Sequence, residues 1–272
     1  MYKNYSVLMS VYCKENPEYL RDSMISIYEQ TLPTNDFVLV CDGPLNNALD
    51  QVIEDMQHVF GNTLHVYRLE ENRGLGEALN YGLHQCKNEL VARMDSDDIS
   101  LKDRCEKELQ VFNSNNKIAI VSGGIEEFID SPKNITGKRV VPKTTVEIIN
   151  FSKKRNPFNH PAVMLRKSIA LEVGGYSEKF HLFEDYYLWI RILMCQYQGI
   201  NLQDTLVYMR TSTNSYERRG GVDYAKDLLR FHKWMLDKKW SSASDFLLAA
   251  VPHAFVCITP NFLRRIIYGR IR

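Results

Sequence analysis

The sequence predicts an α/β protein with a mostly parallel sheet covered by helices on both faces. Two observations carry this prediction. Short apolar runs alternate with amphipathic segments through the first half of the chain. Their spacing is that of strand–helix–strand units, which place successive strands parallel in one sheet.

The elements can be taken in order. Buried strands are predicted at residues 5–12, 36–43, 63–69, 89–95 and 118–124, and helices at 17–30, 46–60, 74–85 and 101–113. The alternation weakens after about Pro132, and residues 138–161 read as a basic, irregular covering segment. A short strand follows, then a helix ending at Gly174-Gly175, a helix opening at Glu184-Asp185 and an amphipathic helix at 223–239. We therefore expect a catalytic domain at 1–215, divided near residue 130, and a basic amphipathic helical region at 216–272.

Composition narrows the classes of partner. The 272 residues are 44% hydrophobic and carry a net charge of +1, so no bulk attraction to nucleic acid is expected. Residues 218–272, however, hold eleven Lys/Arg against four Asp/Glu, a net +7 against −6 for the remainder. This basic segment fits either an anionic partner such as phospholipid headgroups or a solvated surface.

The cellular compartment follows from the cysteines and from the absence of targeting signals. Six cysteines lie scattered without metal-type spacing, which suits thiols in a reducing cytoplasm. The first residues lack the pattern of a signal peptide, and no apolar run approaches the ~20 residues of a transmembrane helix.

Polar residues gather where the predicted strands end. Residues 12–15, 42–43 and 95–98 follow the first, second and fourth strands, and residues 72–74 follow the third. Ligands of parallel α/β sheets bind beyond the carboxyl ends of the strands. We expect these loops to form one cleft.

The stretch "VARMDSDDIS" ends an apolar run, interrupted only by Arg93, in Asp95, Asp97 and Asp98. A turn with a helix cap, in which Asp98 or Ser100 caps a helix at Leu101, explains one of these acids well. A divalent cation held by carboxylates, such as Mg²⁺ or Mn²⁺ on a diphosphate, explains the cluster better.

Two other strand-end loops have competing interpretations. Asp42 fits a plain Asp-Gly turn as well as an acceptor for a nucleotide base or ribose. Arg73 fits either a solvated loop arginine or a guanidinium that pairs with a diphosphate. The "GLG" after it does not have the spacing of a dinucleotide-binding fingerprint.

The segment "FEDYYLWIRI" starts a helix with two acids, which alone indicates favourable charge at the positive end of the helix dipole. Its aromatic residues read as core, although Tyr186 or Trp189 could also form a sugar platform. His160 and His181 read as ordinary loop histidines.

Taken together, six blocks resemble the family 2 glycosyltransferases of the GT-A fold. The blocks are "SVLMSVYCKENPEYLRDSMISIYEQTL", "VLVCDG", "NRGLGEALNYGL", "VARMDSDD", "VGGYSE" and "FEDYYLWIRI", in the family's order across roughly residues 5–215. The resemblance is to the bacterial enzymes that build O-antigen, capsule or exopolysaccharide repeat units. The QxxRW block of processive members is absent, and only Arg218 and Arg219 lie near its place.

The resemblance implies a role for each matching residue. Val11, Tyr12 and Glu15 line the nucleotide pocket, Asp42 contacts the base, and Arg73 lies near the nucleotide. Asp95 and Asp97 are the acids of the DxD motif, with Asp97 the direct metal ligand. Asp185 is the catalytic base with Glu184 beside it, and Gly174, Gly175 and Tyr176 lie on the acceptor side, where Trp189, Arg218 and Arg219 are further candidates.

The implied activity is inverting transfer of one sugar, a hexose or N-acetylhexosamine, from a UDP-sugar to a lipid-linked saccharide, with Mn²⁺ or Mg²⁺ as cofactor. The alternatives are a nucleotidyltransferase and a non-catalytic nucleotide-sugar-binding protein. A lipid-linked acceptor suits a cytoplasmic enzyme on the inner face of the plasma membrane. There the basic tail 260–272 would lie on the anionic surface, or else pack on the domain.

Overall fold

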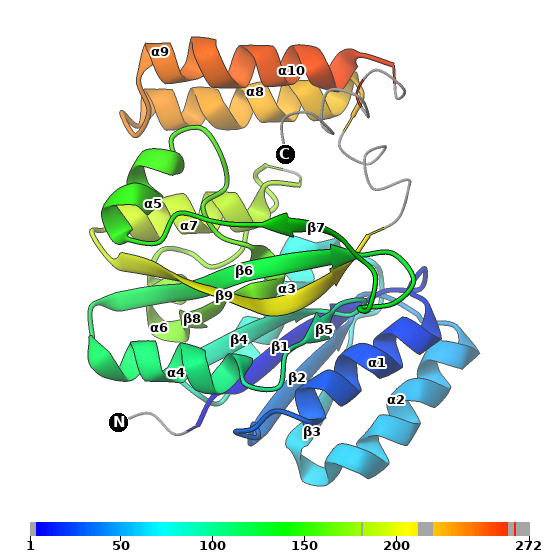
Figure 1. Cartoon of the computed structure of the whole chain (residues 1–272). Helices are drawn as coiled ribbons and strands as arrows, with labels where there is room; N and C mark the ends of the chain where they lie inside the picture. Colours follow the sequence, from blue (N-terminus) through cyan, green and yellow to red (C-terminus); the bar gives the residue numbers. More distant parts are fainter. Residues whose placement is uncertain (1–3, 181, 212–219, 261–263, 265–272) are drawn as a thin grey trace.

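The computed structural model describes residues 4–180, 182–211, 220–260 and 264. Its centre is a nine-stranded sheet in the order β3-β2-β1-β4-β8-β6-β9-β5, with β7 paired to β6 (Figure 1). The strands are β1 Ser6–Val11, β2 Asp36–Cys41, β3 Leu64–Arg68, β4 Leu90–Asp95, β5 Ile99–Ser100, β6 Ile118–Phe128, β7 Ile135–Arg139, β8 Met164–Arg166 and β9 Gln198–Arg210.

The sheet is parallel in its first half and mixed in its second. β3, β2, β1 and β4 are all parallel neighbours, as the strand–helix alternation predicts. β8 then pairs antiparallel with both β4 and β6, and β9 runs parallel to β6 over its whole length. The parallel register lines up the ends of β1, β2 and β4, so the loops that follow them start at one edge.

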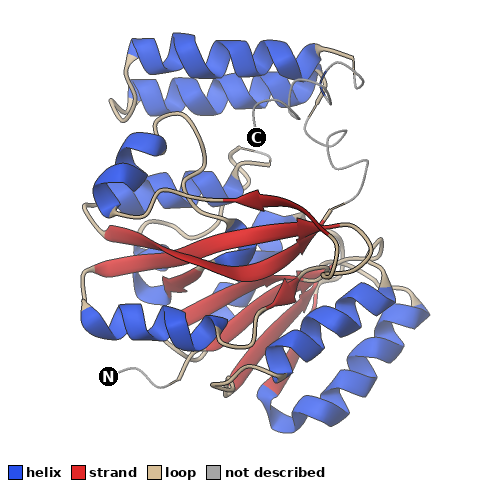
Figure 2. Ribbon diagram, in the orientation of Figure 1, coloured by secondary structure: helices blue, strands red, loops and turns tan. Residues whose placement is uncertain are grey.

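Helices cover both faces of the sheet, as predicted (Figure 2). The side chains of α1, α2 and α4 pack into one core with the sheet, and those of α3, α5, α6 and α7 form a second core on the other face. The bounds are α1 Pro17–Tyr28, α2 Asn47–Phe60, α3 Leu75–Gln85, α4 Arg104–Ser114, α5 Thr145–Phe151, α6 Lys167–Glu172 and α7 Glu184–Met194.

Asparagine side chains cap the first two helices. Asn16 accepts a hydrogen bond from the amide of Glu18 and precedes Pro17, whose fixed φ suits the first helical position. Asn46 accepts one from the amide of Leu49, 3.0 Å away. The helix starts are thus determined locally.

Two sequence predictions are wrong in this region of the chain. Residues 138–161 are not irregular: they contain the end of β7 and the helix α5, which begins with a capping box between Thr144 and Glu147. The helix predicted at 101–113 begins only at Arg104, and the short strand Ile99–Ser100 before it, which pairs with β9, was not predicted. Both deviations come from short elements whose partners lie far away in the sequence.

A fourth layer lies on α7 (Figure 1). It consists of α8 Val222–Asp237 and a second rod formed by α9 Ala243–Asp245, the π-helical turn Phe246–Ala250 and α10 Val251–Ile258. Pro252 has no N–H to donate, and the turn just before it is the widened one. Among the described residues, no helix is both long and apolar enough to traverse a bilayer.

Candidate active site

The acidic turn after β4 brings three carboxylates together. One ligand oxygen from each of Asp95, Asp97 and Asp98 lies within 4.8 Å of the others. The turn is also tied to α1, since the Ser23 hydroxyl donates to the carbonyl of Asp95 at 2.7 Å. Oxygen donors at this spacing are what a hard divalent cation requires.

Burial and the proximity of these acids to one another raise the pKa values of Asp97 and Asp98. Burial, then the charges of Asp95 and Glu15, raises the pKa of Asp97 to about 7. Burial and the charges of Asp97 and Asp95 raise the pKa of Asp98 as well. A cation among these oxygens would remove the repulsion, so the residues present fit a divalent metal.

Asp98 does not cap a helix, so that explanation of its presence is wrong. It is almost fully buried, and its Oδ1 accepts a hydrogen bond from the backbone amide of Arg210 at the end of β9, at 2.7 Å. Arg210 also donates from Nε to the carbonyl of Asp97. The end of β9 therefore holds the acidic turn in place, which the sequence did not indicate.

The loop after β1 contacts the same turn. The hydroxyl of Ser96 donates a short hydrogen bond to Glu15, whose other oxygen accepts from the amide of Asn16. Val11 is buried at the end of β1, and Tyr12 after it is exposed. Glu15 and the acidic turn, predicted to share a site, are thus directly connected.

The loops after β2 and β3 are held together by Asp42. Its two carboxylate oxygens accept from the backbone amides of Arg73 and Gly74 at 2.7 and 3.0 Å. Burial raises the pKa of Asp42, and these two hydrogen bonds partly offset the rise. The Arg73 side chain is half exposed and lies 3.7 Å from Glu71. Asp42 is therefore an anchor for the loop that carries Arg73, in addition to any contact with a ligand.

Arg93 lies beneath the acidic turn, and sequence reasoning missed it. Its guanidinium is 2% exposed and donates a short hydrogen bond from Nη2 to Asp95. Within the described part of the chain, its Nε and Nη1 have no hydrogen-bond partner. Burial lowers the pKa of Arg93 while Asp95 raises it, with a net upward shift. A lone charge inside an apolar strand was the signal that could have identified it.

Glu184 and Asp185 occupy the first turn of α7. Burial and the charge of Asp185 raise the pKa of Glu184 to about 7. Asp185 accepts from the side-chain amide of Asn156 at 2.7 Å and from the amide of Tyr186 at 2.6 Å. Asn156 orients this carboxylate, and its distance in sequence hid that role.

The start of α7 belongs to the same region as the strand-end loops. A Cβ built on Gly76, in the first turn of α3, would lie 3.2 Å from Cβ of Glu184. The Tyr176 hydroxyl experiences the charges of Arg93, Asp185, Glu184 and Asp95, and with burial foremost its pKa is raised. The charge of Arg93 and the charges of acids from both groups therefore act on the same buried hydroxyl.

The loop before Tyr176 has a constrained backbone. Gly174 and Gly175 have φ of 94° and 61°, and a Cβ on Gly175 would lie 2.0 Å from Oδ1 of Asn80. Arg191 of α7 donates to the carbonyls of Val173 and Gly175. The backbone that leads to Tyr176 is therefore held in place by its glycines and by Arg191.

Several acceptor-side candidates are placed differently from expectation. Trp189 is fully buried and packs edge-on against Phe158, so its faces are closed to a sugar, and the platform interpretation is wrong. Tyr176 is also buried, and its hydroxyl lies 3.1 Å from Nε2 of His160, which is therefore more than a loop histidine. His181, Arg218 and Arg219 lie outside the described residues.

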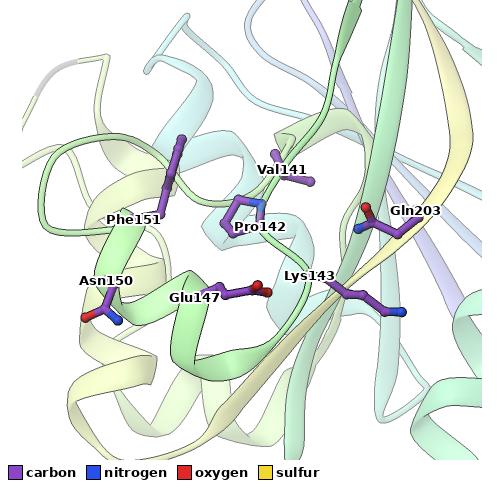
Figure 3. A pocket seen from close by; sticks show the side chains of 7 residues that line it. All are labelled: Val141, Pro142, Lys143, Glu147, Asn150, Phe151 and Gln203. Atoms are coloured by element: carbon purple, nitrogen blue, oxygen red, sulfur yellow. The ribbon is translucent and has the colours of Figure 1, made fainter.

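A pocket elsewhere on the surface is separate from these residues. It is lined by the segment before α5, by α5 itself and by β9 (Figure 3): Val141, Pro142, Lys143, Glu147, Asn150, Phe151 and Gln203. None of these seven residues belongs to the acidic turn or to the start of α7. The pocket is therefore not the candidate active site.

A family model described as "Glycosyl transferase family 2" matches residues 6–174, a range that holds the strand-end loops and the acidic turn. The chain belongs to glycosyl transferase family 2. This membership makes the chain an enzyme and decides against the nucleotidyltransferase and the non-catalytic alternatives.

Two relatives span almost the same length as this glycosyltransferase. An Escherichia coli UDP-Gal:alpha-D-GlcNAc-diphosphoundecaprenol beta-1,3-galactosyltransferase is 36% identical over 267 residues, which cover 98% of this chain and 96% of the relative. An amylovoran biosynthesis glycosyltransferase of Erwinia amylovora is 35% identical over 235 residues, 86% of each chain.

Solved structures establish the fold of this glycosyltransferase. A Pyrobaculum calidifontis mannosyltransferase in complex with GDP-Man and Mn²⁺ has a TM-score of 0.67 at 14% identity, covering 98% of this chain and 80% of that one. S. aureus TarS 1–349 in complex with UDP has a TM-score of 0.59 at 20% identity, covering 83% and 65%. The fold is GT-A, as predicted.

Proposed function

We propose that this glycosyltransferase moves one hexose or N-acetylhexosamine residue from a UDP-sugar to a hydroxyl of a lipid-linked saccharide, with inversion at the transferred carbon. One observation carries the proposal. The acidic turn and the start of α7 both border the strand-end loops: Ser96 of the turn donates to Glu15, and a Cβ on Gly76, after β3, would lie 3.2 Å from Cβ of Glu184. The carboxylates that would bind the cation and the carboxylate that would accept the proton therefore lie in one region of the protein.

The donor would lie over the strand-end loops. Val11, Tyr12 and Glu15 would line the nucleotide pocket, Asp42 would contact the base, and Arg73 would lie by the diphosphate. In support, Asp42 holds the Arg73 loop against the end of β2, and Glu15 touches the acidic turn. These contacts join four strand-end loops in two pairs, and Asn46, after β2, links the pairs by donating to the carbonyl of Cys13, after β1.

Asp97, with Asp95, would hold Mn²⁺ or Mg²⁺, which when bound neutralises the charge that develops on the diphosphate leaving group. Asp95 is already fixed by Arg93, and the backbone of Asp97 is fixed by Arg210. Asp98, whose Oδ1 is engaged by β9, would support the turn.

Asp185 would take the proton of the acceptor hydroxyl as that oxygen forms a bond to the sugar carbon. The bond from that carbon to the diphosphate breaks on the opposite face, which inverts the configuration. The side-chain amide of Asn156 donates to Oδ2 and the amide of Tyr186 donates to Oδ1, so both oxygens of this carboxylate are held in place. Glu184 would lie beside it.

The acceptor assignment follows from the relatives. One relative's name specifies a GlcNAc-diphosphoundecaprenol acceptor, and another's specifies amylovoran biosynthesis. We therefore place the enzyme in bacterial surface-polysaccharide synthesis, in the cytoplasm at the inner face of the plasma membrane. Gly174, Gly175 and Tyr176 would shape the acceptor side, and Arg218 and Arg219 stay candidates outside the described residues.

The base assignment is tested with Asp185→Asn, because asparagine keeps the shape but cannot accept the proton. We expect UDP binding in the presence of Mn²⁺ to persist by calorimetry, while transfer from the best of a panel of UDP-sugars falls at least a hundredfold. The control is Asp223→Asn, since Asp223 lies in the first turn of α8 but is exposed. Normal turnover by Asp185→Asn would remove the assignment. Asp97→Ala, in contrast, should lose the Mn²⁺-dependent part of UDP binding.

A further inference from the structure

The rod formed by residues 243–258 exposes an apolar face. Leu248 is 76% exposed and Phe255 is 68% exposed. They belong to a row at helical spacing that comprises Leu247, Leu248, Val251, Phe255 and Ile258. Isolated apolar residues are common on protein surfaces, but a continuous row of large ones indicates an interaction site.

The fold does not need this face. The opposite side of the same rod packs against α8 through Ala250, Ala254 and Cys257, which are all buried. α8 in turn packs on α7 through Phe231, so the hairpin is already anchored by its inner surfaces. The outer row therefore contributes little to the stability of the monomer.

The exposed face of the neighbouring helix α8 is of the opposite kind. It carries ion pairs between residues three or four apart: Asp223 with Lys226, Asp227 with Arg230, and Asp237 with Lys233. Two adjacent helices of one hairpin thus present a charged surface and an apolar one. The difference shows that the apolar row is specific to the second rod.

The charge of this part of the chain indicates the partner. From Phe246 to Arg272 the sequence contains no Asp or Glu and has four arginines. An apolar row followed in the sequence by arginines, with no acidic residue between them, suits an interface with anionic lipid headgroups. The rod is too short to cross a bilayer, so it would lie along the surface.

We infer that the Leu247–Ile258 face is a membrane-docking surface that inserts its apolar side chains into the headgroup region of an anionic bilayer. The location agrees with the chemistry, since the hairpin lies on α7, the helix whose first turn holds Glu184 and Asp185 (Figure 1). This last argument rests on the proposed function, in which the acceptor is held by a lipid. Docking here would present the acceptor side of the enzyme to the membrane.

The test is sedimentation of the full chain with vesicles of equimolar phosphatidylcholine and phosphatidylglycerol, and with vesicles of phosphatidylcholine alone. The variant is Leu248→Ser with Phe255→Ser. The control is Val140→Ser with Val146→Ser, which removes two residues that are 68% and 70% exposed elsewhere on the surface. We expect the wild type and the control to bind the mixed vesicles, and the variant to bind them at least tenfold more weakly. Binding to the neutral vesicles should be weaker for all three.

Three results would overturn the inference. The first is vesicle binding by the variant equal to that of the wild type, and the second is no vesicle binding by the wild type. The third is a wild-type dimer in light scattering that the variant turns into a monomer while vesicle binding is unchanged, which would make the face an interface between copies. Transfer to a water-soluble acceptor in the absence of vesicles should be the same for wild type and variant. If the wild type showed no transfer to that acceptor, the proposed function would be contradicted, whereas the result of the vesicle experiment would still hold.

Discussion

Arg93 shows how one buried side chain can organise an active site. It is placed in the middle of the central strand β4, and the only full ion pair it makes among the described residues is with Asp95. Its charge also acts on Asp97, Asp98 and Glu184, lowering the pKa of each against the larger upward effect of burial. We expect Arg93 to position the acidic residues, without contacting the substrates.

Removing this charge should cost stability. Arg93→Met leaves the 31%-exposed Asp95 without its charged hydrogen-bond donor, which should cost about 2 kcal/mol. Urea denaturation should show this decrease in the free energy of unfolding. Arg68→Met serves as the control, because Arg68 also lies in a strand and pairs with an aspartate, but at an exposed site. There the change should stay below about 1 kcal/mol. Equal effects of the two substitutions would contradict the role assigned to Arg93.

At the scale of elements, the first turn of α7 is where two effects compete. The positive end of a helix dipole stabilises a carboxylate, whereas burial destabilises it. For Glu184 burial wins, since its pKa is raised to about 7. Glu147, in the first turn of α5, is the opposite case, because hydrogen bonds from Thr144 lower its pKa. Similar positions in two helices therefore have opposite electrostatic consequences.

This contrast predicts opposite pH dependences for two substitutions. Below pH 4.5, the ordinary pKa of glutamate, Glu184 is protonated in both folded and unfolded chains and has no effect. As pH rises from there to about 7, only the unfolded chain releases the proton, so stability falls by at most about 3 kcal/mol. Glu184→Gln should therefore be more stable than wild type at pH 8 and equal to it near pH 4.

Glu147→Gln should instead be less stable than wild type at pH 8, because a lowered pKa stabilises the fold at pH values above the ordinary pKa. That difference should vanish as pH falls through the lowered pKa. Thermal melts at both pH values give the comparison. A Glu184→Gln protein destabilised at pH 8 would show that burial does not dominate at α7.

The whole molecule is a stack of four layers in which α7 is internal. Leu188, Trp189 and Ile192 face the sheet, while Tyr186, Tyr187 and Ile190 face the C-terminal hairpin. α7 therefore packs against the hairpin through residues that directly follow Glu184 and Asp185 in its first turn.

Substituting two phenylalanines of this hairpin, one buried and one exposed, distinguishes residues that stabilise the fold from residues available for docking. Phe231 is fully buried between α7 and the second rod, so Phe231→Ala should lower the free energy of unfolding by about 3–5 kcal/mol. It should also reduce transfer activity, because it loosens α7. Phe255→Ala changes the same residue type on the outer face and should alter stability by less than about 0.5 kcal/mol. Chemical denaturation checks both values, and similar losses would mean that the outer face also belongs to the core.

Much of the fold could be predicted from local patterns. The strand–helix alternation, the caps at Asn16 and Asn46 and the acidic cluster after β4 are short-range features, and the structure contains all of them. The errors are in elements stabilised from a distance. β5, for example, is a two-residue strand that exists because it pairs with Tyr208 and Val207 of β9.

The sequence by itself determined the strand–helix alternation of the first half and the strand-end position of the acidic turn, and its six motif blocks indicated the family. The alternation and the turn depend on periodicity and spacing, which act over a few residues. Only the tertiary structure decided what each acid contacts. Asp98 contacts Arg210, 112 positions away, and Asp185 meets Asn156, 29 positions away. The burial that raises the pKa of Glu184 exists only after the layers have packed, because desolvation is a property of the assembled fold.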